Sequence, residues 1–405
     1  MSIVDDHQRR PALPSRTVVP LALDTAGVVS AAGVGLQPLA DALRAGAVAG
    51  GAPPAAHEAE DYPPLPLRPA DFVAADLLGP KGLNRLTRAE QLGMAACTLA
   101  LGPVADRSAT GVVLGSAVGS SGGVGRFTRD TFVQERPYMV NPSAFPGTLM
   151  NAAAGRTAIR HGLTDANATV SGGPLASLHA LRFARNALVA GHARRLLTGG
   201  VEELSPQSAW AWQRAGSLAP GTALGEGAAV FALRTLQGSG DGDSPLALVM
   251  ALRTGFAAGG PLAVARRLST CVRDALARSG VGAQDIAVVA PGAAGRRGWA
   301  AVEERALRTA LDGSDGSDGS QCSDGSDGSG APRGSRGRDG RYVLRVQEVL
   351  GETHGASAAL QVAAVVARWH DPHLDTRGER AGLVTSVGPD GSVGCAVLLH
   401  PHAGL

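Results

Sequence analysis

The chain has 405 residues, of which 44% are hydrophobic and 18% charged, with a formal net charge of +2 at pH 7. This composition is that of a globular protein with a sizeable core, and it excludes disorder over the whole chain. The near-neutral charge and the scattered basic residues give no reason to expect a nucleic-acid partner. No apolar run reaches the roughly 18 residues of a membrane span, and the first residues lack a signal-peptide core. We therefore expect a cytoplasmic protein that does not span a membrane.

Apolar runs alternate with turn residues along the first half of the chain. After a flexible leader over residues 1–17, the pattern predicts the following elements: a strand over 18–23, a helix over 36–45 ended by Gly46, a loop-like stretch over 47–70, a helix from Thr87 to about residue 101, and a strand over 111–117. Thr87 and Glu90 have the spacing of a capping box, in which each side chain satisfies a free backbone amide of the other residue.

The same alternation continues to the end of the chain. It predicts helices over 142–154, 174–190, 263–279 and 299–311 and after Gly355, and strands ending at Ser171 and covering 196–199, 286–290, 383–387 and 393–399. Strands alternating with helices in two successive halves, 18–240 and 241–405, predict a layered α/β fold.

One segment, residues 312–340, breaks this pattern. It repeats Asp-Gly-Ser units, then becomes Arg- and Gly-rich, and offers almost no apolar side chain for burial. We expect a disordered surface insertion. The repeats lack the bidentate glutamate of a calcium loop, so no metal site is predicted there.

The four cysteines, Cys97, Cys271, Cys322 and Cys395, lie far apart and form no Cys-x-x-Cys pair. This spacing favours neither a zinc site nor a disulfide framework, so we expect reduced, mostly buried thiols and no metal or cofactor.

Five short motifs together point to one family. They are NPSAFP at 141–146 followed by NAAAG at 151–155, GGVEE at 199–203, LGEGAA at 224–229, GASAA at 355–359, and ATVSGGPLASLHAL at 168–181. In this combination the chain resembles the β-ketoacyl synthase family of the thiolase superfamily over about residues 18–399. The resemblance implies a thiolase-like αβαβα fold made of two similar halves.

In that family a cysteine opens the helix after the 168–171 strand and takes the acyl chain as a thioester, helped by the helix N-terminus. The resemblance places Pro174 at this cysteine. A proline suits a first helical position because its missing N–H would have no helical partner, but it carries no nucleophile.

The other reactive positions are also substituted. Pro291 and Glu352 correspond to the two catalytic histidines and Gln347 to the lysine, and the only lysine of the chain, Lys81, lies elsewhere. The two oxyanion donors fall on Pro174 and Pro389, which have no N–H. Loss of one such donor typically costs about 2.7–4 kcal/mol of transition-state stabilisation, so condensation by the usual mechanism is not expected.

The remaining polar residues leave one enzymatic alternative. Ser171 with His354 or His179 would form a substitute acyltransferase site, although a histidine near a helix start is more often a packing residue. We expect Glu202, Glu203 and Glu226 to order their turns through hydrogen bonds.

A synthase frame without reactive groups resembles the chain-length factor, or β subunit, of type II polyketide synthases. The resemblance implies a chain inactive alone, paired with a cysteine-bearing ketosynthase α subunit and serving an acyl carrier protein. It also implies that Phe127, Thr128, Thr131 and Phe132 line and close the acyl-chain tunnel at the interface. Ordinary helix packing is the alternative role for these side chains, and a homodimeric scaffold is the alternative for the whole chain.

Overall fold

A computed structural model describes residues 19–48, 61–102, 106–236, 244–313, 334–336 and 340–403. The predicted leader over 1–17, Cys322 and most of the 312–340 segment lie outside these ranges. None of the described helices is both long and apolar enough to cross a membrane.

Strands of both halves form one mixed sheet in the order β11-β12-β10-β13-β14-β9-β1-β8-β6-β4-β5, with β2 beside β1. The halves meet at β1, which pairs antiparallel with β8 and, over its first residues, with β9. The strands are β1 Leu21–Ser30, β2 Gly33–Val34, β3 Leu67–Arg68, β4 Thr110–Gly115, β5 Asn167–Val170, β6 Arg195–Glu202, β7 Leu224–Gly225, β8 Gly227–Thr235, β9 Ala247–Phe256, β10 Ile286–Ala290, β11 Gly334–Arg336, β12 Tyr342–Leu344, β13 Ala381–Val387 and β14 Ser392–Leu399. Strands β3 and β7 form a separate parallel pair.

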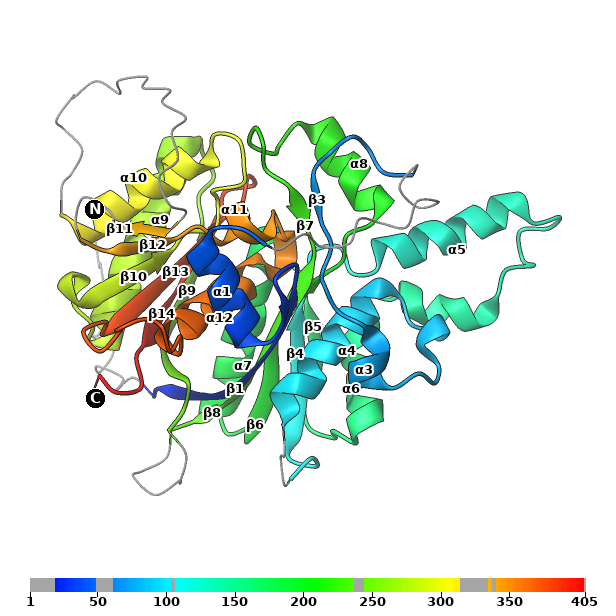
Figure 1. Ribbon diagram of the computed structural model, residues 1–405, viewed down its shortest axis with the longest axis horizontal. Helices are drawn as coiled ribbons and strands as arrows, with labels where there is room; N and C mark the ends of the chain where they lie inside the picture. Colours follow the sequence, from blue (N-terminus) through cyan, green and yellow to red (C-terminus); the bar gives the residue numbers. More distant parts are fainter. Residues whose placement is uncertain are drawn as a thin grey trace, which may run out of the picture.

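The helices form layers around this sheet (Figure 1). Helices α7 and α12 contact each other and strands of both halves, whereas α4 and α6 pack on the N-terminal strands and α9 and α10 on the C-terminal strands. The helices are α1 Leu36–Ala45, α3 Ala74–Leu78, α4 Arg88–Leu101, α5 Ser121–Val133, α6 Ala152–His161, α7 Ala176–Val189, α8 Pro206–Ala215, α9 Pro261–Ser279, α10 Trp299–Leu311, α11 Val346–Leu350 and α12 Ser357–Trp369. Short 3-10 turns are η1 Leu83–Arg85, η2 Pro142–Thr148, η3 Gly173–Leu175, η5 Ala283–Asp285 and η6 His354–Ala356. The predicted layered α/β fold is confirmed.

The central position of α12 explains its composition. Every residue of this helix except Arg368 is buried, because strands and α7 surround it. A helix with one buried face carries polar residues on its exposed face. The apolar residues all round α12 therefore match its position between strands of the N-terminal and C-terminal parts of the sheet.

The capping box at the start of α4 is present as predicted. The side-chain oxygen of Thr87 accepts from the Glu90 N–H at 3.4 Å, and Glu90 Oε2 accepts from the Thr87 N–H at 2.6 Å. This reciprocal pair fixes where the chain enters α4.

The predicted continuous helix over 142–154 is wrong. The structure has the 3-10 turn η2, a break at 149–151, and then α6 from Ala152. Pro146 lacks the N–H that an α-helix needs, and the Leu149 N–H reaches only three residues back, to the Pro146 carbonyl at 3.3 Å.

Helix α5 extends away from the layered body (Figure 1). It packs against η2 through Phe127 and Phe145, whose ring centroids lie 5.9 Å apart. We call residues 121–150 the α5 arm. Half of the exposed large hydrophobic side chains among the described residues lie on it: Val124, Phe132, Val133, Tyr138, Met139, Phe145, Leu149 and Met150. Exposed apolar surface concentrated in this way marks an interaction site.

The prediction of a disordered insertion over 312–340 is wrong for residues 334–336. Residues Gly334–Arg336 inside it form β11, which pairs antiparallel with β12. Asp312 at the end of α10 forms an ion pair with Arg341 at 2.8 Å.

Candidate functional site

The turn after β5 corresponds to the nucleophile turn identified in the sequence. Gly173 has a φ of +53°, a conformation that favours glycine, and Pro174 follows within η3. Pro174 therefore lies in a 3-10 turn, and α7 begins two residues later than predicted, at Ala176. The Pro174 side chain is buried and its carbonyl accepts from Ser386 Oγ at 3.0 Å. This position offers neither a nucleophile nor an N–H donor.

His354 lies next to this turn. A Cβ atom added to Gly173 would lie 3.9 Å from His354 Nε2. His354 has a φ of 44°, the only positive value of a non-glycine residue in the described chain, and its ring packs edge-on against Trp212 with centroids 5.3 Å apart. Burial lowers the pKa of the His354 imidazole, with the Arg296 charge adding to the effect and Glu352 opposing it. The lowered pKa favours the neutral form of the packed ring.

The substitute Ser/His site does not form in this structure. Ser171 is exposed, and its Oγ donates to the Ala117 carbonyl at 3.3 Å. Across the described ranges, no hydrogen bond joins Ser171 to His354 or His179. A serine without a base in hydrogen-bond contact is not activated as a nucleophile.

Glu352, which the resemblance assigns to the second histidine position, forms a buried ion pair. Its Oε2 accepts from Arg296 Nε at 3.0 Å, and its Oε1 accepts from the His354 N–H at 2.9 Å. The side chains of Glu352 and Arg296 are 0% and 3% exposed. Arg296 also donates to the carbonyls of Val387 and Gly292. Both oxygens of the Glu352 side chain accept these structural hydrogen bonds, so the carboxylate is not available as a free acid or base.

Gln347 joins the same network. Its Nε2 donates to the Gly292 carbonyl at 3.3 Å and to Ser357 Oγ at 3.0 Å. Glu303 of α10 accepts from the Gly292 N–H at 3.0 Å and the Ala293 N–H at 2.7 Å, and burial raises its pKa. Residues 347 and 352 are therefore brought together around the backbone at Gly292, where they hold structure.

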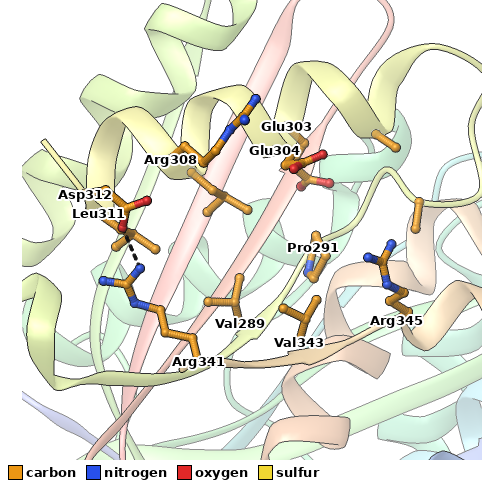
Figure 2. A pocket seen from close by; sticks show the side chains of 13 residues that line it. Val289, Pro291, Glu303, Glu304, Arg308, Leu311, Asp312, Arg341, Val343 and Arg345 are labelled. Atoms are coloured by element: carbon orange, nitrogen blue, oxygen red, sulfur yellow. Dashed lines mark hydrogen bonds and ion pairs between the residues drawn. The ribbon is translucent and has the colours of Figure 1, made fainter. Parts of the chain in front are cut away.

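Pro291, which the resemblance assigns to the first histidine position, lines a cavity of about 700 Å³ beneath α10. Figure 2 shows the Pro291 ring near the middle of this cavity, with Glu303 and Glu304 of α10 above it and Arg345 to one side. No group able to transfer a proton replaces the imidazole at residue 291.

Pro389 lies in the turn between β13 and β14. Its side chain is exposed, and the turn is closed by Asp390 Oδ1, which accepts from the Ser392 N–H at 3.1 Å and Oγ at 2.6 Å. Because proline has no N–H, residue 389 provides no oxyanion donor.

The three glutamates expected to order turns do so. Glu202 accepts from the N–H groups of Ala117, Val118 and Gly355, Glu203 accepts from those of Ala89 and Gly122, and Glu226 accepts from those of Ala70 and Leu204. These contacts tie the strand ends of the N-terminal half to η6 and α4.

The four predicted tunnel residues all lie on α5. Phe127 is half-buried against Phe145, whereas Phe132 is 81% exposed. Thr128 is exposed, and its carbonyl accepts from Thr131 Oγ1 at 2.6 Å. Within this chain, Phe132 has the exposure of a residue that a partner would cover, and Phe127 that of a helix-packing residue.

Two residues that contact the site, Arg296 and Trp212, were not predicted from the sequence. Arg296 neutralises Glu352, and Trp212 packs on His354. Each lies more than 50 positions from its partner and outside the motifs, so only the tertiary structure reveals these contacts.

Comparisons with known proteins agree with this geometry. The family model described as "Beta-ketoacyl synthase, N-terminal domain" matches residues 78–238. The 3-oxoacyl-[acyl-carrier-protein] synthase 2 of Rhizobium meliloti (strain 1021) is 31% identical over 141 residues, which are 32% of this chain and 32% of that protein. The chain thus spans about a third of the length of the curated relatives it matches.

Solved structures match over nearly the whole chain. A chain of "the ishigamide ketosynthase/chain length factor" is 30% identical with a TM-score of 0.75, covering 94% of this chain and 99% of that one. A chain of the ketosynthase in complex with its chain length factor from Xenorhabdus doucetiae has a TM-score of 0.72 at 13% identity, covering 96% and 99%. The second likeness shows the fold alone.

Proposed function

The chain belongs to the β-ketoacyl synthase family, and we propose that within it the chain acts as a noncatalytic chain-length factor of a polyketide synthase. One feature supports the proposal: the family resemblance assigns the reactive positions to Pro174, Pro291, Gln347, Glu352 and Pro389, and none of these residues offers a nucleophile, a free base or an oxyanion donor. A ketosynthase-like fold without reactive groups can still bind a catalytic partner and shape the cavity in which that partner works.

A cysteine-bearing ketosynthase is the proposed partner. Two features of this chain support the pairing: the α5 arm with its exposed apolar side chains, and β5, which ends the sheet and pairs only with β4 among the described strands. An unpaired edge next to apolar surface is a ready site for another chain. Obligate pairs bury large apolar areas, so the isolated chain is expected to be poorly soluble.

An acyl carrier protein is the second proposed partner. A groove of about 820 Å³ lies between α5 and α8. Arg126, Arg129 and Arg214 line it with Trp210, and the acidic residues Asp61, Glu203 and Glu226 also line it, the two glutamates being buried. No ion pair of Arg126, Arg129 or Arg214 is found among the described residues. Cationic side chains in a groove attract an anionic partner, such as the phosphodiester of a carrier protein's arm.

Residues of the α5 arm are proposed to limit the length of the chain that the partner builds. Phe132 on α5 is 81% exposed, and none of the described residues covers it, so its side chain is available to fill space in a partner's tunnel. Phe127 packs inside the arm and would act by holding α5 against η2.

Co-expression with a cysteine-bearing ketosynthase and a carrier protein tests the proposal. We expect product only when both chains are present, and longer products with Phe132→Ala. Leu262→Ala, on α9 and outside the α5 arm, is the matched control for loss of exposed apolar surface and should leave product length unchanged. Unchanged product length with Phe132→Ala would contradict the tunnel role, and product formation by the ketosynthase without this chain would contradict the factor role.

A further inference from the structure

The two helices that flank the open edge strand β5 carry basic residues and no acidic ones. Helices α6 and α7 both contact β5, and β5 pairs with β4 on one side only. Their sequences, AAAGRTAIRH and ASLHALRFARNALV, contain no aspartate or glutamate. Asp165 just before β5 is used internally, since it accepts from the Ala166 N–H at 2.7 Å.

The arginines of α6 are satisfied within the chain. Arg156 forms an ion pair with the buried Glu90, and Arg160 Nη2 donates to the Leu78 carbonyl at 2.6 Å. These contacts hold both α6 side chains toward α3 and α4, away from the open side of α7, and the charge of Arg156 is neutralised by Glu90.

The arginines of α7 form no ion pair with an acidic residue in the part of the chain that the structure describes. Arg182 Nη1 donates to a neutral group, Thr254 Oγ1, at 2.6 Å. Arg185 is half-buried, its Nη1 atom is buried, and no acceptor for that atom exists among the described residues. Burial lowers the pKa of Arg185, and no carboxylate opposes the effect. An enclosed guanidinium nitrogen without an acceptor is costly, which indicates an acceptor outside this chain.

Apolar side chains accompany these cations on the open side of α7. Phe183 is 43% and Val189 47% exposed, whereas the opposite side of the helix, with Leu181 and Ala184, is buried. Ile159 on α6 is 85% exposed. The surface beside β5 is therefore an apolar patch that includes Arg182 and Arg185, neither of which is paired with a described carboxylate. Apolar residues around a few arginines are the typical composition of the central part of a protein interface.

Symmetry makes this surface a poor match for itself. If two copies joined through antiparallel β5 strands, the two-fold axis would run perpendicular to the sheet, and α7 would lie beside α7 of the other copy. Arg182 and Arg185 would then approach like charges in a desolvated interface, which disfavours that pairing.

We infer that the β5 edge selects a partner whose helix beside the paired strand presents carboxylates to Arg182 and Arg185, and that it disfavours a second copy of this chain. The inference rests on the proposed pairing with a ketosynthase and adds the chemistry that the partner surface must have. It also separates the heterodimer from the homodimeric scaffold.

Binding measurements with charge-reversed variants test the inference. The probe is the cysteine-bearing ketosynthase that supports product formation in the co-expression experiment above. We expect Arg182→Glu/Arg185→Glu to weaken its binding by about 30-fold or more, because the partner's carboxylates would lose their cations. Arg185→Gln, which removes the charge and keeps donors, should give an intermediate loss. Arg266→Glu/Arg305→Glu, on the exposed faces of α9 and α10, changes net charge equally and should leave binding unchanged.

Sedimentation of the wild-type chain alone gives an independent readout. We expect no dimer at low ionic strength, where repulsion between like charges is strongest. A wild-type homodimer under these conditions, or equal ketosynthase binding by wild type and the double glutamate variant, would overturn the inference while leaving the proposed function intact. Failure of the wild-type chain to bind any ketosynthase would instead overturn the proposed function.

Discussion

Replacing Glu352 by glutamine should destabilise the chain strongly, although glutamine has nearly the same shape. Glu352 and Arg296 are 0% and 3% exposed and lie 3.0 Å apart. Removing one charge from such a pair leaves the other buried without compensation, which costs about 3–5 kcal/mol. The contact from the His354 N–H to Oε1 survives in glutamine, so the loss reports the ion pair.

Urea unfolding followed by circular dichroism measures this loss as a lower midpoint at an unchanged slope. Glu304→Gln on α10 is the matched control, because Glu304 is exposed and has no ion pair within the described ranges; its effect should stay within about 0.5 kcal/mol.

A second variant keeps the test informative if Glu352→Gln does not fold. Adding Arg296→Met removes both charges and leaves mainly the Val387 carbonyl without its donor, at a cost of about 1–3 kcal/mol. The double variant should therefore be more stable than Glu352→Gln alone. A loss below about 1 kcal/mol for Glu352→Gln, or a double variant less stable than the single one, would refute the structural role assigned to residue 352.

Three further predictions concern packing, pH and thiol chemistry. Gly199→Ala should destabilise the chain by about 1–3 kcal/mol or more, because the new Cβ would lie 1.9 Å from the Ala229 carbonyl oxygen. Gly155→Ala on α6 is the control: its Cβ meets nothing within 4 Å, so it should stabilise the chain by about 0.5–1 kcal/mol. Equal unfolding midpoints for the two variants would contradict this prediction. Burial raises the pKa of Glu202 to about 7 from its usual 4.5. The folded chain thus binds the proton of Glu202 more tightly than the unfolded chain does. The contribution of Glu202 to stability is therefore full below about pH 4.5 and falls as pH rises to 7. The decrease in unfolding free energy over this pH range should be smaller in Glu202→Gln, and an identical pH profile for the two chains would exclude the effect. Burial raises the pKa of Cys97 to about 12 and that of Cys395 well above its usual range, so iodoacetamide at pH 8 should leave both unmodified in the native chain, and their alkylation seen by mass spectrometry would count against it.

Local patterns predicted much of the fold. The capping box at Thr87 and Glu90, the glycine stop after residue 45 and the apolar periods of α9 and α10 each depend on residues within one turn or strand. The helix predicted over 142–154 failed because two prolines favoured a 3-10 turn over an apolar spacing that was itself compatible with a helix.

The candidate site was predicted from the sequence only in part. Motif spacing identified Pro174, Gln347 and Glu352, since these positions are fixed by short glycine-rich frames. It did not identify Arg296, which is 56 residues from Glu352, nor the contact of Trp212 with His354. Motif spacing predicts which reactive groups are missing, whereas only the folded structure shows the buried contacts that Gln347 and Glu352 make.

The most direct measurement is mass spectrometry of the purified chain after incubation with an acyl-loaded carrier protein, with and without a cysteine-bearing ketosynthase. The acyl group should appear on the ketosynthase and never on this chain, and elongation should require both proteins. A covalent acyl adduct on this chain, or an elongated thioester formed by it without a partner, would contradict the account.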